Sequence, residues 1–474
     1  MASCKPVKIL IRCKVTPPAG SAPTSSVLPL TFFDIHWLPL PPLEFLFFYE
    51  FPYPKSQFTH SIVPRLKHSL SSTLIHFYPL SGNISWPLEP NQPIIRYSEG
   101  DSSVSFTVAE SDADFYHLSS NHLKDAIESR PLLPHLLASG PILPMLAIQV
   151  TVFPNTGFCI GVTFQHSIFD GRAFSHFMRT WASISKLGTA SLPPESLPVL
   201  DRTAIKDQAG FTKIFLDELD RFMGSELESG NRRLRVMDVQ LQPNMVRATF
   251  TINDASSRRL KEWVFSQYKK DDQTKTIPPS RFVAICAYTW ICLLKAEEKI
   301  GVSKTNNMTR FVVTIDSRAR LDPPILETYL GNCIRPCVVI AKKTDLIRGG
   351  VAMAAQMIGA AIRELDKGIL GGFENSVSDL LELQSGRILS NAGSPQLEFY
   401  KTDFGFGRLK KVEMASIDKT GAMFLKESSS GDGGYEFDFV LNREEMDAFV
   451  SVFNGGLNAM DECSLSPSTL RSLL

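Results

Sequence analysis

Two apolar runs, joined by a tight turn and ending at a histidine, constrain this chain more than any other feature. Met145 to Phe153 is rich in β-branched and apolar residues, and Phe158 to Phe164 is a second such run. Between them stands Pro154-Asn155-Thr156-Gly157, where proline fixes φ and glycine accepts a positive φ. The pattern predicts a hairpin of two buried strands. We expect the second strand to end at Gln165-His166, where the apolar run stops.

Helical spacing begins after this histidine. Apolar residues recur at the intervals of an amphipathic helix, namely at Phe174, Phe177, Met178, Trp181 and Ile184. His166 is therefore expected where a core strand opens into a tight loop. Asp170 follows four residues later, close enough to brace that loop through bonds from its side chain to the backbone.

Three interpretations of His166 are open at this point. Histidine is the usual general base near neutral pH, because its unperturbed pKa is about 6.5. Alternatively, His166 is a loop residue at the end of a strand and Asp170 caps the next helix. A pattern as short as H-x-x-x-D-G does not separate these two. A metal site of His166, Asp170 and His176 is disfavoured, because His176 lies inside the helix and no ligand-spaced cysteine or second histidine pair supports it. We expect no metal.

Length and charge exclude some classes of protein. The 474 residues are too many for one ordinary core, so we expect two domains. A hydrophobic fraction of 43% and a charged fraction of 21% are typical of a soluble globular protein. The 49 basic and 49 acidic residues give a formal net charge of zero, which argues against a nucleic-acid-binding protein. Local cations can still hold an anionic small molecule.

The cysteines and the N-terminus indicate a cytoplasmic protein. The eight cysteines are scattered, and several lie inside apolar runs, as buried free thiols do. Cys333-x-x-x-Cys337 has no second pair, so zinc is not expected and a reducing compartment fits best. Met1 to Lys14 mixes cations with apolar residues and does not resemble a signal peptide. No uninterrupted run reaches the roughly 18 apolar residues of a membrane span, so we expect no membrane partner.

Strands and helices alternate along most of the chain. Leu187 to Gln208 is rich in proline, serine and polar residues and is the best linker candidate. Strands are predicted at Lys5–Val15, Phe311–Ile315, Glu398–Phe404 and Tyr435–Leu441, and helices at Ser61–His76 (beginning close to Pro64), Ala255–Tyr268, Pro278–Lys295, Thr344–Leu365 and Arg443–Phe453. The alternation, with its antiparallel hairpins, suggests α/β layers sandwiched together.

Two motifs together resemble the plant BAHD acyl-CoA-dependent acyltransferases. His166 to Gly171 matches the H-x-x-x-D-G motif of that family, and Asp403-Phe404-Gly405-Phe406-Gly407 is similar to its D-F-G-W-G motif. Either motif alone is weak, but both in this order, more than two hundred residues apart, are a specific signal. Phe406 replaces the motif's tryptophan, and we expect this aromatic exchange to leave the packing intact.

The resemblance runs nearly end to end and favours the malonyltransferases of phenolic and flavonoid glycosides. That branch carries a Y-F-G-N-C motif, and Tyr329-Leu330-Gly331-Asn332-Cys333 is similar to it. Leu330 departs from the motif's phenylalanine. His36 lies in an aromatic segment that faces the acceptor side in relatives. These two departures bear on donor and acceptor, and not on the class of reaction.

The resemblance implies an α/β fold of two similar domains. Each would be a mixed-sheet sandwich of the chloramphenicol-acetyltransferase type, with a channel between them and His166 at its middle. Residues 1–188 would form the first domain with the histidine loop, 189–210 a crossover linker and 211–474 the second domain. Within the second, roughly 378–402 would pack on the first domain.

The reaction implied is transfer of a malonyl group from malonyl-CoA to a sugar hydroxyl of a phenolic or flavonoid glycoside. His166 would remove the hydroxyl proton and return it to the departing thiolate, without an acyl-enzyme, because both substrates are bound together. Transfer of a hydroxycinnamoyl group is the alternative within the class. A non-catalytic relative that binds metabolites is the alternative outside it. Acyl-CoA is thus a co-substrate, no cofactor is expected to stay bound, and a monomer is expected.

The remaining site residues follow from the resemblance and from charge. Asp170, grouped with His166 in the catalytic motif, would point away from the channel and pair with Arg318, while Asp403, Gly405 and Gly407 would be structural. A malonyl carboxylate needs a cation or amide donors. The candidates for substrate binding are Arg172, Asn332 and His36, and those for the phosphates of coenzyme A are Ser280, Arg281, Arg408, Lys410 and Lys411.

Overall fold

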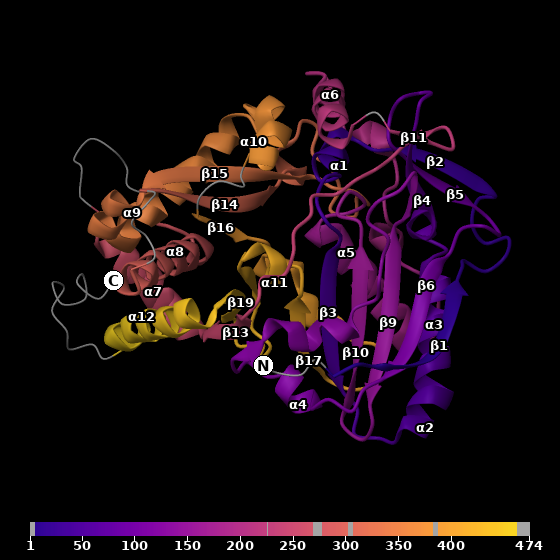
Figure 1. The fold of residues 1–474 in the computed structure, drawn as a ribbon, viewed down its shortest axis with the longest axis horizontal. Coiled ribbons are helices and arrows are strands. Elements are labelled where there is room, and N and C mark those ends of the chain that lie inside the picture. The colour runs from indigo at the N-terminus through magenta and orange to yellow at the C-terminus, as the bar shows by residue number, and fades with distance from the viewer. Residues whose placement is uncertain (1–4, 225, 269–276, 302–306, 383–386, 462–474) are drawn as a thin grey trace.

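The chain folds into two α/β halves that lie side by side (Figure 1). The computed structural model describes residues 5–224, 226–268, 277–301, 307–382 and 387–461. The N-terminal half contains most of the indigo to magenta elements of Figure 1, and the C-terminal half contains the orange and yellow ones. Each half has its own cluster of buried apolar side chains.

The N-terminal half is built on a mixed sheet of six strands. Their order is β1-β6-β9-β10-β3-β17. The strands are β1 (Lys8–Val15), β6 (Val104–Glu110), β9 (Leu146–Phe153), β10 (Gly157–Phe164), β3 (Leu43–Glu50) and β17 (Leu409–Met414). The predicted hairpin is confirmed as β9 and β10, and every residue of both strands is buried. The positive φ in its turn falls on Asn155, at 64°, and not on Gly157 as predicted.

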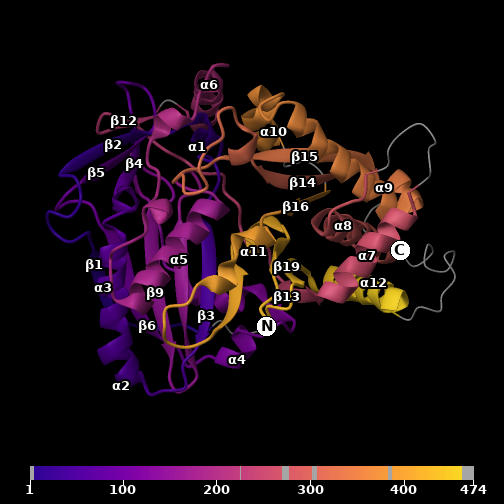
Figure 2. The same ribbon diagram turned by 180° about the vertical axis from the view of Figure 1, so that it is seen from behind.

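Both faces of this hairpin are covered, which explains its apolar character. One face carries α3 (Val63–Thr73) and α5 (Gly171–Leu187), which pack together and are seen from behind in Figure 2. On the other face, the backbone at Leu132 crosses so closely that a Cβ on Gly161 would lie 2.2 Å from its carbonyl oxygen. Strands buried on both sides read as continuous apolar runs.

The helix predicted after the histidine loop is confirmed as α5. Asp170 caps its N-terminus by accepting a hydrogen bond of 3.0 Å from the backbone N–H of Ala173, and Gly188, at φ 70°, ends it. Trp181 is buried and donates a 3.0 Å bond to the hydroxyl of Ser69 on α3. The apolar stripe of α5 thus locks the helix onto the sheet.

A second sheet completes the N-terminal half. Its order is β11-β12-β4-β5-β2, with β8 also paired to β4. These strands are β11 (Leu227–Glu228), β12 (Asn231–Arg232), β4 (Asn83–Pro87), β5 (Ile94–Ser98), β2 (Ser25–Pro29) and β8 (Ile142–Pro144). The short helix α1 (Phe32–His36) follows β2 and leads toward the histidine loop.

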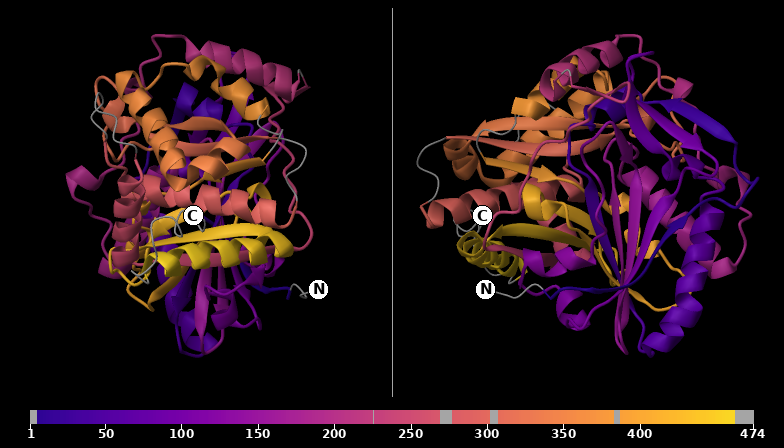
Figure 3. Two further views of the ribbon diagram at one scale, coloured as in Figure 1. Left: turned by 90° about the vertical axis from the view of Figure 1, so that its left-hand side faces the viewer. Right: turned by 45° about the vertical axis from the view of Figure 1, so that its right-hand side comes forward.

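Two smaller sheets and four long helices form the C-terminal half. One sheet has the order β18-β19-β13-β7 and the other β15-β14-β16. The strands are β18 (Phe424–Glu427), β19 (Tyr435–Asn442), β13 (Met245–Ile252), β7 (Lys124–Asp125), β15 (Ile334–Lys342), β14 (Met308–Asp316) and β16 (Arg387–Asn391). The helices are α7 (Asp254–Ser266), α8 (Arg281–Lys299), α9 (Lys343–Glu364) and α12 (Arg443–Asp461). Helix α8 contacts the other three, and the left view of Figure 3 shows orange α9 and yellow α12 on the outer side.

Several elements cross between the halves. Strand β17 comes from the C-terminal part of the chain yet pairs with β3, and β7 comes from the N-terminal part yet pairs with β13. Helix α6 (Phe211–Met223) buries Phe211 and Phe215 in the N-terminal cluster, which Phe399 also joins. The boundaries 1–188, 189–210 and 211–474 stay a prediction. The chain does not divide between the two clusters at a single point.

One helix has the composition of a membrane span. Lys343–Lys367, which comprises α9 and the turn η7 (Leu365–Lys367), is long and apolar enough by length and composition alone. The sequence did not predict such a span here, because charged residues interrupt the apolar run. A single such helix is weak evidence, because core helices pass the same test, although only 33% of its apolar stretch is buried. Its backbone breaks at Gly350 (φ 64°, ψ −164°), and Val351 and Ile358 join the C-terminal cluster.

The strand predicted at Glu398–Phe404 is wrong. The chain there forms two short 3₁₀ turns, η9 (Pro395–Leu397) and η10 (Phe399–Lys401), followed by a loop. Glu398 between them has a φ of 53°, in the left-handed region that interrupts a strand. The apolar residues that suggested a strand are buried for another reason, since Phe399 and Phe404 pack in the N-terminal cluster.

The segment Asp403–Gly407 packs against the C-terminal end of α5. Asp403 accepts a 2.8 Å bond from the backbone N–H of Gly405 and pairs with Lys186 of α5 at 2.7 Å. Gly405 and Gly407 have φ values of 80° and 83°. A Cβ on Gly407 would lie 2.1 Å from the carbonyl oxygen of Glu50. These contacts support the structural role predicted for Asp403, Gly405 and Gly407.

We predict that Gly407→Ala destabilises the protein by more than about 2 kcal/mol, because alanine adds backbone strain at positive φ and meets the β3 backbone. Urea denaturation measures the change in the free energy of unfolding. Gly455→Ala in α12 is the matched control, since nothing lies within 4 Å of its Cβ position. Alanine should stabilise that helix by up to about 1 kcal/mol. Equal effects at the two glycines would contradict the account.

Candidate active site

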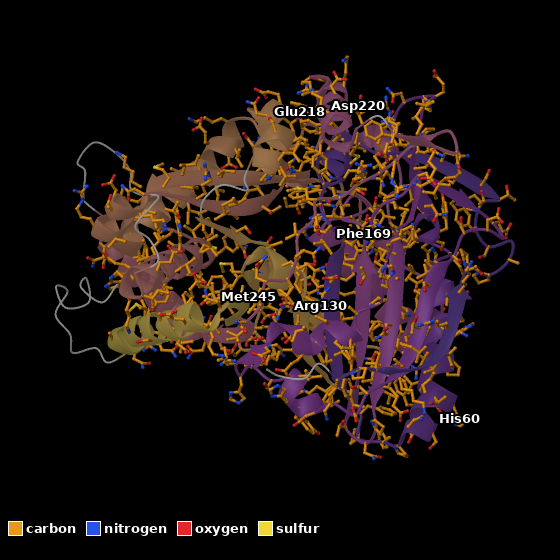
Figure 4. All side chains as sticks on the ribbon, in the orientation of Figure 1. His60, Arg130, Phe169, Glu218, Asp220 and Met245 are labelled. Carbon is orange, nitrogen blue, oxygen red and sulfur yellow. The ribbon has the colours of Figure 1, made fainter. Side chains whose placement is uncertain are left out.

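His166 lies just beyond the end of β10, at the junction of the two halves. Its imidazole is partly exposed and stacks on the ring of Trp37, with centroids 4.5 Å apart and planes 9° from parallel. Phe169, which marks the same loop in Figure 4, packs its ring 4.5 Å from Phe164 in the N-terminal core. The loop is therefore anchored in the core while the imidazole remains accessible. The predicted passage open at both ends stays a prediction.

The surroundings of His166 favour its neutral form. Burial lowers the pKa of the imidazole to about 4, although its own carbonyl oxygen and the carboxylate of Asp170 act in the opposite direction. Nδ1 is buried without a hydrogen-bond partner among the described residues, whereas Nε2 is not enclosed in this way. A neutral imidazole with an accessible nitrogen can accept a proton at neutral pH. This is the state that a general base requires.

Asp170 connects the histidine loop to the C-terminal half. Its carboxylate, 0% exposed, accepts hydrogen bonds from Arg318 Nη1 at 2.8 Å and from Nη2 at 3.2 Å. It also accepts a 2.9 Å bond from the backbone N–H of Cys333. Among the described residues, no hydrogen bond joins Asp170 to the imidazole of His166. Asp170 thus caps α5 and pairs with Arg318 at the same time, and its part in the site is structural.

We predict that Asp170→Asn lowers the free energy of unfolding by about 3–5 kcal/mol, because it leaves the buried guanidinium of Arg318 without its counter-charge. Chemical denaturation measures this loss. The control is Asp217→Asn, which removes an exposed pair with Lys213 and should cost less than about 1 kcal/mol. If the two variants lose the same stability, the Asp170–Arg318 pair does not support the fold as described.

Arg172 is already paired with carboxylates of the C-terminal half. Its Nε lies 2.6 Å from Asp316, and its Nη1 lies 3.3 Å from Glu327. The guanidinium would have to leave these partners to bind a malonyl carboxylate. The role predicted for Arg172 in substrate binding stays a prediction, and the geometry gives it a second role as a contact between the halves.

Asn332 is fully buried, and its amide nitrogen donates two hydrogen bonds, both to groups of the protein. Nδ2 donates to the carboxylate of Asp34 at 3.1 Å and to the backbone carbonyl of His166 at 3.0 Å. The backbone N–H of Asn332 donates to the same oxygen of Asp34 at 2.8 Å. This arrangement counts against a direct contact with substrate, which the sequence predicted for Asn332.

His36 lies in an aromatic enclosure beside the site. Its ring is 4.5 Å from that of Trp37 and 5.7 Å from that of Phe373. The side chain is 0% exposed, and neither ring nitrogen has a hydrogen-bond partner among the described residues. Burial lowers the pKa of His36 to about 3, and the positive charge of Arg335, together with that of His166 when its imidazole is protonated, acts in the same direction. The role predicted for His36 in acceptor binding stays a prediction, and it requires this enclosure to open.

We predict that His36→Phe makes the protein less sensitive to acid. The folded pKa of His36 lies below the ordinary value, so the unfolded chain takes up a proton that the folded one does not between about pH 6.5 and 3. His36 therefore lowers the free energy of unfolding by about 2 kcal/mol between pH 7.5 and pH 5. Urea denaturation at both pH values measures this loss, which should shrink in His36→Phe. An unchanged loss would show that His36 does not titrate as described.

The candidates for binding coenzyme A are not gathered in one place. Ser280 caps α8 by accepting from the backbone N–H of Val283 at 3.1 Å. Arg281 pairs with Asp254 at 2.6 Å and lies 5.1 Å from the centroid of the Tyr435 ring. Both therefore have local partners in the C-terminal half, and their predicted contact with coenzyme A stays a prediction.

The basic residues near β17 lie toward the far end of the first sheet. Leu43 of β3 pairs with Phe164, two residues before His166, whereas Leu409 of β17 pairs with Tyr49 at the other end of β3. Arg408 is exposed there, about 20 Å from the His166 end at about 3.4 Å per residue. Lys410 pairs with Glu50, and Lys411 is buried against Asn121 and Thr249. Lys411 is therefore wrong as a phosphate ligand, while Arg408 stays a prediction.

Sequence reasoning missed Trp37 and Arg202. Trp37 follows His36 directly and fixes the plane of the imidazole, but a tryptophan in an aromatic segment carries no distinctive signal. Arg202 is buried in the predicted linker, where only its distant partners Asp34 and Tyr329 reveal its use. Among the described residues, no group of three or more histidine, cysteine or acidic side chains could hold a metal. His176 instead contacts the carbonyl oxygen of Ser196 at 2.9 Å.

A family model described as the Transferase family matches residues 6–455. The chain belongs to this family. Its members are the BAHD acyl-CoA-dependent acyltransferases that the motifs resembled, so this protein is an acyltransferase of that type. The malonyl-coenzyme:anthocyanin 5-O-glucoside-6'''-O-malonyltransferase of Salvia splendens is 36% identical over 468 residues, covering 95% of this chain and 96% of its own.

Relatives with another donor in their names are almost as similar. The coumaroyl-CoA:anthocyanidin 3-O-glucoside-6''-O-coumaroyltransferase 1 of Arabidopsis thaliana is 35% identical over 489 residues, covering 96% of this chain and 99% of its own. Among solved structures, vinorine synthase aligns with a TM-score of 0.66 and 20% identity, covering 93% of this chain and 96% of that one. This likeness confirms the predicted fold of two mixed α/β domains.

Proposed function

We propose that this acyltransferase moves a malonyl group from malonyl-CoA to a sugar hydroxyl of a phenolic or flavonoid glycoside. The observation that carries the proposal is the neutral, partly exposed imidazole of His166, held where the two halves meet. The malonyl donor and the glycoside acceptor are supported by the Tyr329–Cys333 motif and by the name of the 36%-identical malonyltransferase.

His166 acts as the general base in this proposal. Its accessible nitrogen removes the proton from the sugar hydroxyl as the oxygen attacks the thioester carbonyl. The tetrahedral intermediate then expels the thiolate of coenzyme A, which takes the same proton from the imidazolium. An ester and free coenzyme A are formed, and His166 returns to its neutral state. Two substrates held together make an acyl-enzyme unnecessary, because proximity lowers the entropic part of the barrier.

The environment of His166 suits this cycle. A low pKa keeps the imidazole unprotonated, and therefore able to accept a proton, at neutral pH. The resulting imidazolium is a strong acid in that environment, which favours return of the proton to sulfur. Asp170 stabilises this cation only from a distance, because its carboxylate is engaged with Arg318.

We further propose that the protein acts as a cytoplasmic monomer without a bound cofactor. The six cysteines that the structure describes are all free, in keeping with a reducing compartment.

One competition experiment decides the donor. Malonyl-CoA and coumaroyl-CoA are supplied together with anthocyanidin glucosides and simple phenolic glucosides, and the products are identified by mass. We expect malonylated glucosides. Coumaroyl products without malonyl products would transfer the proposal to an aromatic donor. Folded protein that uses neither thioester on any glucoside would overturn the proposed reaction and indicate a non-catalytic relative.

The same assay tests the base. We predict that His166→Ala lowers kcat by about 10²–10⁴-fold, the usual contribution of a general base. His60→Ala is the matched control, because His60 is exposed at the periphery of the N-terminal half in Figure 4. His60 should be dispensable. Wild-type turnover by His166→Ala would exclude the proposed proton transfer.

A further inference from the structure

The segment Tyr329–Cys333 contacts both ends of the histidine loop. All five of its residues are buried, and Tyr329, Leu330, Asn332 and Cys333 have exposed fractions of 2% or less. It lies between the turn η6 (Arg318–Arg320) and β15 of the C-terminal half, whereas the side chains of Tyr329, Leu330 and Cys333 pack in the N-terminal cluster.

The first end of the loop is held by Asn332. Its amide donates to the backbone carbonyl of His166 at 3.0 Å, and the same amide is steered by Asp34 at 3.1 Å. Asp34 is 0% exposed and also caps α1, since it accepts from the backbone N–H of Thr31 at 3.0 Å. The side-chain amide of Asn332 thereby links the backbone carbonyl of His166 to the buried carboxylate of Asp34.

The second end of the loop is held by Cys333 and Arg318. The backbone N–H of Cys333 donates to Asp170 at 2.9 Å. Arg318 binds Asp170 and also donates to the carbonyl oxygens of Tyr329 and Gly331, at 3.3 Å and 3.2 Å. The guanidinium thus joins the segment to the loop. Residues 166 and 170 are fixed by the same five-residue stretch.

Arg202 contacts both this segment and Asp34. Its Nη1 donates to the hydroxyl of Tyr329 at 2.9 Å and pairs with Asp34 at 3.2 Å. A Cβ on Gly331 would lie 2.1 Å from that same nitrogen, so only glycine leaves room for the guanidinium. The backbone N–H of Leu330 also donates to Val199 at 2.9 Å. The chain around Arg202 therefore determines where the segment lies.

We propose that Tyr329–Cys333 positions His166, and that Asn332 acts on the reaction through the backbone of His166 instead of binding the donor. Asn332 is a positioning residue in this sense. The proposal rests on the proposed function only in taking His166 as the base. It assigns a role to Tyr329, Gly331, Asn332 and Cys333 from contacts within this chain.

Loss of the Asn332 side chain should free one end of the loop while Asp170 still holds the other. The stacking on Trp37 would then be the main constraint on the imidazole, and water would reach the ring more easily. The charged and titratable groups that act on this ring are Asp170 and His36. Neither is changed by the substitution, so greater hydration should move the pKa of His166 upward toward its ordinary value.

Asn332→Ala and Asn391→Ala form a matched pair for the test. Asn391 at the end of β16 is also buried, and its Nδ2 donates to the carbonyl oxygen of Gly393 at 2.6 Å, but none of its described hydrogen bonds involves the histidine loop. With whichever acyl-CoA the wild type uses, we predict that Asn332→Ala lowers kcat about 10- to 100-fold, as expected for a base displaced by about 1 Å. KM for both substrates should change less than about threefold. Asn391→Ala should retain the wild-type kcat.

A contact between Asn332 and the donor would give a different pattern. KM for malonyl-CoA would rise while kcat stayed near the wild-type value, and a donor without the free carboxylate would be unaffected. That pattern would overturn the proposal, as would full activity of Asn332→Ala. A loss confined to the amount of folded protein, equal in both asparagine variants, would also overturn it.

A second measurement needs no turnover. Diethyl pyrocarbonate modifies neutral imidazoles, and peptide mass mapping reports the rate at His166. In the wild type this rate, corrected for reagent decay, should stay level from pH 7.5 to pH 5, because the ring remains neutral. In Asn332→Ala it should fall at least about tenfold at pH 5, since a pKa near the ordinary value leaves little neutral ring there. A level profile in both proteins would overturn the proposal.

This second readout separates failure of the inference from failure of the proposed function. Wild-type protein that uses no acyl-CoA would refute the function, while the modification profiles would still test the positioning of His166. If Asn332→Ala does not fold, Asn332→Ser replaces it. Its hydroxyl has one proton to donate and satisfies Asp34 or the His166 carbonyl, but not both. The same upward shift, smaller in size, is then expected, and its absence would count against the proposal.

Discussion

The buried pair of Asp170 and Arg318 fixes the two halves of the molecule beside the proposed general base, His166. Asp170 is 0% exposed at the start of α5, and Arg318 is 2% exposed just after β14, so each belongs to a different half. Separation of the halves here would strand both charges, at a cost of several kcal/mol. His166 lies four residues before Asp170 and inherits its position from this contact. Burial in the same junction keeps the imidazole neutral, which is the property that the reaction needs.

Other buried charges extend this contact along the boundary. Lys124 of β7 meets Glu413 of β17 at 2.5 Å, so each of these crossing strands is tied to the other by an ion pair. Arg247 of β13 pairs with Asp418, and Figure 4 labels Met245, at the start of the same strand, and Arg130. Ion pairs buried this deeply are weak evidence for stability, because desolvation offsets much of their attraction. Their geometry nevertheless specifies how the halves meet.

The sequence predicted what local pattern and motif determine. The hairpin β9–β10, helix α5, its cap at Asp170 and the pairing of Asp170 with Arg318 all followed from spacing or from the resemblance. The remaining features depend on residues far apart in the chain. Arg172 forms ion pairs with Asp316 and Glu327, and Asn332 donates a hydrogen bond to Asp34. No local sequence pattern shows these contacts. The register of β17 on β3 carries Arg408 away from the His166 end. Burial of Phe399 in a turn imitated a strand, since an apolar run reports burial and not backbone conformation.

The most direct test of the account is a crystal structure with coenzyme A and the acceptor glucoside bound together. The account predicts that the accessible ring nitrogen of His166 lies about 2.6–3.2 Å from the sugar hydroxyl, with the sulfur of coenzyme A close enough to receive the proton from that same nitrogen. Asp170 should still be paired with Arg318, and Asn332 should still donate to the carbonyl of His166. A hydroxyl bound beyond reach of that ring, or Asp170 turned toward the imidazole, would contradict the central claim.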